Sequence, residues 1–294
     1  HSIEKYNGVS FVGVLSISPS HQSPVPATEA EALSATSGAL LGLSRVASWR
    51  RHLCDTVRLL QQHRGSSLAC LDGDLRFEKT TSALTLQIEG FLQCLHAELA
   101  TLDADADAQA LWRRSDQDWR CLRDGWPQDD ALHSFELHSH LIADLLRLLK
   151  WPLGPLPGEA EVDGLLLEEL PVAIESLAAL RGLSVHTLLN PEDVSLQSRL
   201  AFQVKSVMQE YRSLCRSIHR FSDESIEVTS LRHIILLEER LKTVLEQVPA
   251  SPEVPATDSQ WLFRAFTEII ERYWDGLDAG LCAMERRDKR RLFQ

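Results

Sequence analysis

The chain has 294 residues, of which 44% are hydrophobic and 24% are charged, and its formal net charge is −12. These values are typical of a globular protein with a substantial core, and they exclude a disordered or fibrous chain. The acidic balance argues against a nucleic-acid or anionic-membrane surface, because the average field of the protein repels phosphate.

The first residues differ in composition from the rest of the chain. An apolar stretch over 8–17 resembles a short strand, and the following residues to Pro26 are rich in serine and proline, as linkers are. We therefore divide the chain into an irregular N-terminal segment or linker, residues 1–28, and a helical region, residues 29–294. No run reaches the roughly 18 apolar residues that a membrane span needs.

Long helical patterns separated by clear breaks follow the N-terminal segment. The proline-rich stretch near 152–158 is the strongest break and separates two halves. Elsewhere no stretch alternates as a strand does, so we expect an all-α protein of two antiparallel helical bundles packed together. The helices that we expect are 29–48, 50–71, 76–103, 106–124, 130–151, 160–189, 192–221, 225–248 and 258–289.

One residue pattern occurs twice, and each copy sets an arginine into an apolar helical stripe. Both copies have the same offsets from the arginine, which are −7, −4, 0, +1, +3, +4 and +7. All of these positions except +1 lie along one face of a helix. The first copy is Val57, Leu60, Arg64, Gly65, Ser67, Leu68 and Leu71, and the second is Ile174, Leu177, Arg181, Gly182, Ser184, Val185 and Leu188.

Each arginine thus occupies a position where a core residue is expected. A guanidinium keeps its proton and is costly to bury without a partner. The glycine after each arginine permits close approach to the backbone, and the serine one turn later offers a hydroxyl. Two such guanidinium groups favour one shared anionic partner, because arginine binds planar oxyanions through two parallel hydrogen bonds.

An alternative is that the arginines pair with carboxylates inside the core. Candidate partners are Glu89, Asp144, Glu169 and Glu175. The chain would then be a helical scaffold or a partner-binding regulator without a small ligand.

Three segments together resemble the nitrate- and nitrite-sensing (NIT) domain family. They are 59–71 with Gly73 and Phe77, 133–149, and 174–184, and the resemblance extends over roughly residues 45–290. It implies an all-helical protein of two bundles that binds nitrate or nitrite through arginines at their interface and relays the signal to an output module. Arg64 and Arg181 match the anion-binding arginines of the family.

The resemblance also implies a third cation in a later helix. The best-matching position is Lys242, with Arg240 as the other candidate. A lysine lacks the planar fork of arginine and is a different anion ligand. The RNA-binding output module that is usual in the family is not evident, so we expect a protein partner or a separate output domain, and we leave a homodimer open.

Other chemistry is poorly supported by the sequence. Gly65 to Ala69 comes near a nucleophile elbow, but the residues before it are helical where that motif needs a strand. His138 and His140 point to opposite sides of a helix and cannot share a metal without distortion. We therefore expect no enzyme, no metal and no cofactor. The six cysteines form no Cys-x-x-Cys pair, so we expect reduced, mostly buried thiols in a cytoplasmic protein.

Overall fold

The computed structural model describes residues 27–102, 104–151, 160–221, 226–248 and 258–293. Every regular element within these ranges is helical, which confirms the all-α class. The elements are α1 (Ala27–Leu71), η1 (Leu75–Phe77), α2 (Glu78–Leu99), α3 (Ala106–Gly125), η2 (Trp126–Gln128), α4 (Ala131–Leu149), α5 (Ala160–Gly164), η3 (Leu165–Glu169), α6 (Leu170–Leu189), α7 (Val194–Phe221), α8 (Ile226–Thr229), α9 (Arg232–Ile235), α10 (Glu238–Glu246) and α11 (Ser259–Arg291). Nearly all of the predicted N-terminal segment, and the proline-rich break, lie outside the described residues.

Two helices begin at aspartate caps, as local chemistry favours. The Asp130 carboxylate accepts hydrogen bonds from the first backbone N–H groups of α4, and Asp258 does the same at the start of α11. The end of α1 is fixed by Gly73, which has φ +93°, a conformation that side chains rarely tolerate. These signals lie close to the predicted boundaries.

Two predicted boundaries were wrong. Helix α1 continues through the break expected at residue 49, because Trp49 is fully buried and no glycine or proline interrupts the turn there. The single helix expected over 225–248 is divided into α8, α9 and α10. Buried residues there recur every third position, and i to i+3 hydrogen bonds link Val228, Leu231, Ile234 and Leu237, as in 3-10 turns.

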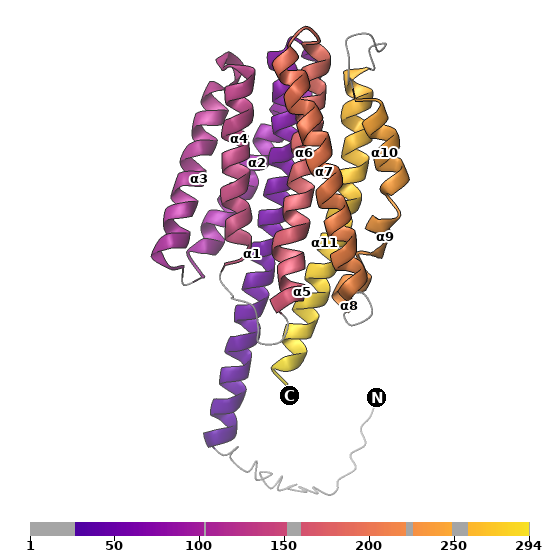
Figure 1. Cartoon of the computed structure of the whole chain (residues 1–294). Helices are drawn as coiled ribbons and strands as arrows, with labels where there is room; N and C mark the ends of the chain where they lie inside the picture. Colours follow the sequence, from indigo (N-terminus) through magenta and orange to yellow (C-terminus); the bar gives the residue numbers. More distant parts are fainter. Residues whose placement is uncertain (1–26, 103, 152–159, 222–225, 249–257, 294) are drawn as a thin grey trace, which may run out of the picture. The chain divides into compact units, whose positions relative to one another are not determined.

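The chain divides into two units at Gly38, and residues 39–294 form the larger one. Within it, the later part of α1 lies with α2, α3 and α4, while α6, α7 and α11 pack together (Figure 1). Helix α1 also contacts α6 and α11 through hydrogen bonds and ion pairs, and α4 packs on α6. The two groups of helices therefore share a long seam, which passes between α1 and α4 on one side and α6 and α11 on the other.

Helix α6 is buried nearly all round, and it begins with an irregular turn. Residues Leu165–Glu169 form a π-helical turn directly before α6, and Pro171, the second residue of α6, has no backbone N–H to donate. The stretch Glu161–Leu189 is the one helix in the described chain that is long and apolar enough to cross a membrane, and 67% of its apolar 18-residue window is buried inside the protein. Its burial is that of a core helix.

Tryptophans form part of the core, as the sequence predicts. Trp112 and Trp119, seven residues apart on α3, are both buried, and the Trp112 ring lies 6.1 Å from that of Trp49. The side chain of Trp126 lies outside the described residues. The expectation of mostly buried cysteines was wrong, since only Cys54 is buried while Cys94 and Cys121 are exposed.

Candidate functional site

Arg64 lies on α1 with its side chain fully buried, and it has an internal carboxylate partner. Its two terminal nitrogens donate to the Glu175 carboxylate at 2.5 and 3.2 Å, and Nη1 also donates to Ser139 Oγ at 2.9 Å. The guanidinium carbon is 4.9 Å from the centroid of the Phe135 ring. Arg64 is therefore paired with a carboxylate inside the core, which is the alternative that the sequence offered for both arginines.

Arg181 lies on α6 and is 1% exposed, but no carboxylate pairs with it. Its Nη1 donates to Thr267 Oγ1 at 2.8 Å and its Nη2 to the Gln61 carbonyl oxygen at 2.6 Å. Its guanidinium carbon is 4.5 Å from the centroid of the Phe263 ring. Burial, and then the charge of Arg64, lower the pKa of Arg181 to about 9, so the guanidinium remains protonated at neutral pH.

The two arginines are joined by a short chain of hydrogen bonds. Gln61 donates through Nε2 to the same Glu175 carboxylate that holds Arg64, and its carbonyl oxygen accepts from Arg181. Three buried atoms in this cluster have no hydrogen-bond partner, namely Arg64 Nε, Arg181 Nε and Gln61 Oε1. Buried polar atoms are normally satisfied, so the cluster has unused capacity for a small polar ligand or water.

Each arginine contacts an aromatic ring and a hydroxyl group from a later helix of its own half of the chain. Phe135 and Ser139 of α4 hold Arg64, while Phe263 and Thr267 of α11 hold Arg181, with the same spacing of four residues. Both hydroxyls also donate to the carbonyl of their phenylalanine. Sequence reasoning missed these residues, although an aromatic residue followed by a hydroxyl one turn later occurs in both helices.

The glycines bring the two halves together. A Cβ at Gly65 would lie 2.7 Å from Phe263 Cε2 and 3.6 Å from Arg181 Nε, and a Cβ at Gly182 would lie 3.1 Å from Phe135 Cε2. Each glycine thus accommodates the ring that covers the arginine of the other half. The sequence predicts that another group approaches the backbone closely at each glycine. In this structure that group is an aromatic ring.

The duplication is broken at one charged position. Six residues before each arginine stand Arg58 in the first copy and Glu175 in the second. Glu175 pairs with Arg64, whereas Arg58 points to acids of α11, with its Nε 3.2 Å from Glu271 and its Nη2 3.6 Å from Asp278. Arg181 therefore has no carboxylate where its counterpart has one.

The remaining predicted site residues occupy other positions. Ser67 and Ser184 are buried, but their hydroxyls donate to carbonyls of their own helices, those of Arg64 and Leu180. Lys242 is 42% exposed on α10, and its ammonium contacts Glu238 and Glu239 of the same helix. Arg240 is also exposed and pairs with Glu268. The structure thus brings Arg64, Arg181, Gly65 and Gly182 together, and it holds Lys242 and Arg240 on surface carboxylates.

Two buried histidines adjoin Arg64. His138 Nδ1 donates to the Ser134 carbonyl oxygen at 2.6 Å, which leaves its Nε2 to accept from His63 Nδ1 at 2.8 Å. Burial lowers the pKa of His63 to about 4 and that of His138 well below its usual range, so both are neutral at pH 7. They add no charge to the arginine cluster. Among the described residues, no group of three metal-binding side chains converges.

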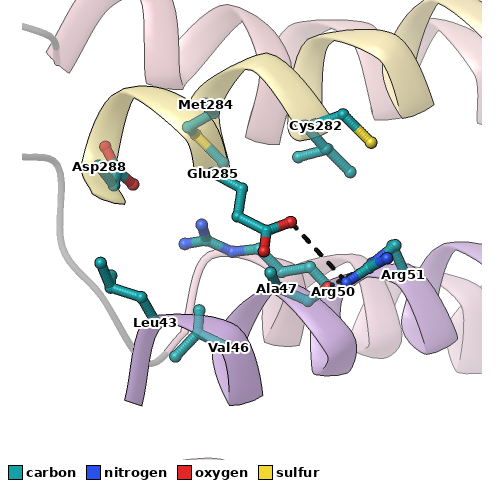
Figure 2. Close-up of a pocket in the computed structure, with 10 residues that line it drawn as sticks. Leu43, Val46, Ala47, Arg50, Arg51, Cys282, Met284, Glu285 and Asp288 are labelled. Carbon is teal, nitrogen blue, oxygen red and sulfur yellow. Dashed lines mark hydrogen bonds and ion pairs between the residues drawn. The ribbon is translucent and has the colours of Figure 1, made fainter. Parts of the chain in front are cut away.

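A separate small pocket lies between the α1 and α11 helices near the C-terminal end of α11 (Figure 2). Its cations are already engaged, since Arg50 Nε donates to the Leu149 carbonyl and Arg51 lies 3.8 Å from Glu285. The other lining residues are mostly apolar and include Leu43, Val46 and Met284. This pocket contains none of the predicted anion-binding residues.

Comparison with known proteins gives one structural likeness. No family model matches the chain, and no curated protein matches it. The chain is similar to the solved structure of the NasR transcription antiterminator, with a TM-score of 0.67 and 16% sequence identity, over 91% of this chain and 75% of that one. At this level of identity the likeness establishes the fold, so the helices around Arg64 and Arg181 belong to the fold that NasR has.

Proposed function

We propose that this chain is a cytoplasmic sensor domain that binds nitrate or nitrite between Arg64 and Arg181. Binding favours one helix arrangement and is relayed to an output partner. The observation that carries the proposal is the fully buried Arg181 guanidinium, which has no carboxylate partner. An uncompensated buried charge is costly unless a partner arrives, and a small planar anion supplies one.

Three further features support a planar oxyanion. In both arginines of the duplicated pattern the Nε–H donor has no hydrogen-bond partner, and arginine binds oxyanions through such donors. Glycine at position 65 lets both the Phe263 ring and Arg181 Nε lie close to the backbone of α1. The fold shared with NasR, a transcription antiterminator, agrees with a regulatory role. Lys242 has no part in this proposed site.

Thermal unfolding with added anions tests the proposal. Ligand at 100 times its Kd stabilises a protein by about 2.7 kcal/mol, which for a domain of this size raises Tm by roughly 5–10 °C. We expect nitrate or nitrite to produce this shift in the natural protein and Arg181→Met to abolish it. Arg120→Met is the matched control, because Arg120 is an exposed arginine paired within α3. A shift that survives Arg181→Met would contradict the proposal.

A second candidate is a helical scaffold or partner-binding regulator without a small ligand. The bidentate pairing of Arg64 with Glu175 favours it, since that arginine is already neutralised. In that case no anion raises Tm in an anion-specific way, and the atoms without partners are satisfied by water.

A further inference from the structure

We infer that Glu175 sets the charge of the ligand that the arginine cluster accepts, and thereby selects monovalent over divalent oxyanions. This inference rests on the proposed function, because it concerns the anion site between Arg64 and Arg181. It assigns a specificity-determining role to a residue that touches Arg64 directly.

The buried cluster of Arg64, Arg181 and Glu175 has a net positive charge. Arg64 and Arg181 each contribute one positive charge, and Glu175 contributes one negative charge. The neighbouring His63 and His138 are neutral, since burial lowers the pKa of both. The cluster therefore has a net charge of +1, which one monovalent anion neutralises.

The charged groups around the cluster do not neutralise its net charge of +1. Arg58 faces the seam from α1 and pairs with both Glu271 and Asp278 of α11, whose side chains are 38% and 44% exposed, so solvent screens the negative charge of this group. Arg199, whose guanidinium carbon is 5.8 Å from the Phe135 ring, pairs with Glu136. Excess charge in this region thus belongs to the buried arginines, and a divalent anion would leave one negative charge buried without compensation.

The two copies of the duplicated pattern differ in charge. Without Glu175, the two guanidinium groups would form a +2 site with matching supports, suited to sulfate or hydrogen phosphate. The carboxylate stands in only one half, six residues before its arginine, where the other half has Arg58. It is 19% exposed, so it also lies on the side of the cluster that solvent reaches.

The test compares anion affinities in the whole chain and in Glu175→Gln. Gln keeps an oxygen for Arg64 to donate to, while the cluster changes from +1 to +2. We expect the natural protein to be stabilised by nitrate and not by sulfate at equal ionic strength. In Glu175→Gln we expect the ratio of the sulfate Kd to the nitrate Kd to fall at least about tenfold. Glu169→Gln is the matched control, because that exposed carboxylate on η3 contacts Ser217 instead of an arginine.

A second variant lowers the charge of the cluster, where Glu175→Gln raises it. Thr267 accepts from Arg181, so Thr267→Glu places a carboxylate beside that arginine and brings the cluster to zero charge. We expect a higher Tm without ligand and loss of the nitrate response. This variant decides the question if Glu175→Gln does not fold.

The outcomes separate the two proposals. If the natural protein responds to no anion, the proposed function fails. If it responds to nitrate but Glu175→Gln discriminates against sulfate as before, or Thr267→Glu retains its nitrate affinity, the role of Glu175 is overturned while the anion site stands. Equal stabilisation of the natural protein by sulfate and nitrate would also overturn the role of Glu175.

Discussion

The Phe263 ring fills the space that a Cβ on Gly65 would need, with its Cε2 atom only 2.7 Å from that position. The same ring lies over the guanidinium of Arg181. The absence of a side chain at residue 65 therefore fixes how closely α1 approaches α11 and where the ring covers the arginine.

Gly65→Ala should destabilise the protein although alanine favours helices. The added methyl group must displace Phe263, and overpacking of this kind costs about 1–3 kcal/mol. We expect a fall in the free energy of unfolding, measured by denaturant titration, and a weaker anion response. Gly90→Ala in α2 is the control, because a Cβ there meets nothing within 4 Å. It should stabilise by about 0.5–1 kcal/mol, and equal effects at both sites would disprove the packing account.

The two arginines should respond differently to removal of their charge. Arg64→Met leaves the Glu175 carboxylate without its partner, and breaking a buried pair in this way costs about 3 kcal/mol. Arg181→Met removes a buried charge that has no carboxylate, and its acceptors keep other partners, so stability should change by less than about 1 kcal/mol. Urea titrations of both variants without added anion measure the contrast. Similar losses would show that Arg181 also has an internal partner.

The protein should lose stability as the pH falls from about 6.5 to about 4. The pKa of His63 is lowered to about 4 by burial, so in this window the unfolded chain binds a proton that the folded chain does not. Stability therefore rises with pH across the window, by about 3 kcal/mol from this one group. Unfolding titrations at pH 4.5 and 7 check the slope. His63→Asn should reduce the slope to the part that His138 contributes, whose pKa burial also lowers, whereas His133→Asn, at an exposed position, should leave it unchanged.

Lys242→Ala should leave both stability and the anion response unchanged. The Lys242 ammonium contacts only exposed or half-exposed carboxylates of its own helix, and such surface pairs contribute about 0–1 kcal/mol. Calorimetric titration of nitrate into the variant measures the response. A loss of binding would restore Lys242 to the site as its third cation.

Periodicity was sufficient to predict the helical class and the burial of both arginines, because a residue within an apolar helical stripe faces the core whatever its charge. It was not sufficient for the partners. Whether Glu175 or another acid holds Arg64 depends on how α6 is rotated against α1, which no local pattern encodes. The same limit applies to Phe135 and Phe263, whose roles require the two halves to be placed face to face. The division of 225–248 was missed because a period of three resembles a period of 3.6 over so short a stretch.

The contacts at Gly65 and Gly182 have a consequence for movement along the seam. Positions three and four residues apart share one face of a helix and lie about 5–6 Å apart along it, so a slide along the seam would place Phe263 against Gln61 or Leu68 in place of the glycine. Intermediate positions are sterically blocked, and α1 and α11 can therefore exchange only between distinct registers. A ligand that favours a different register would cause a stepwise displacement of one helix along the other, large enough to be transmitted to the helix ends.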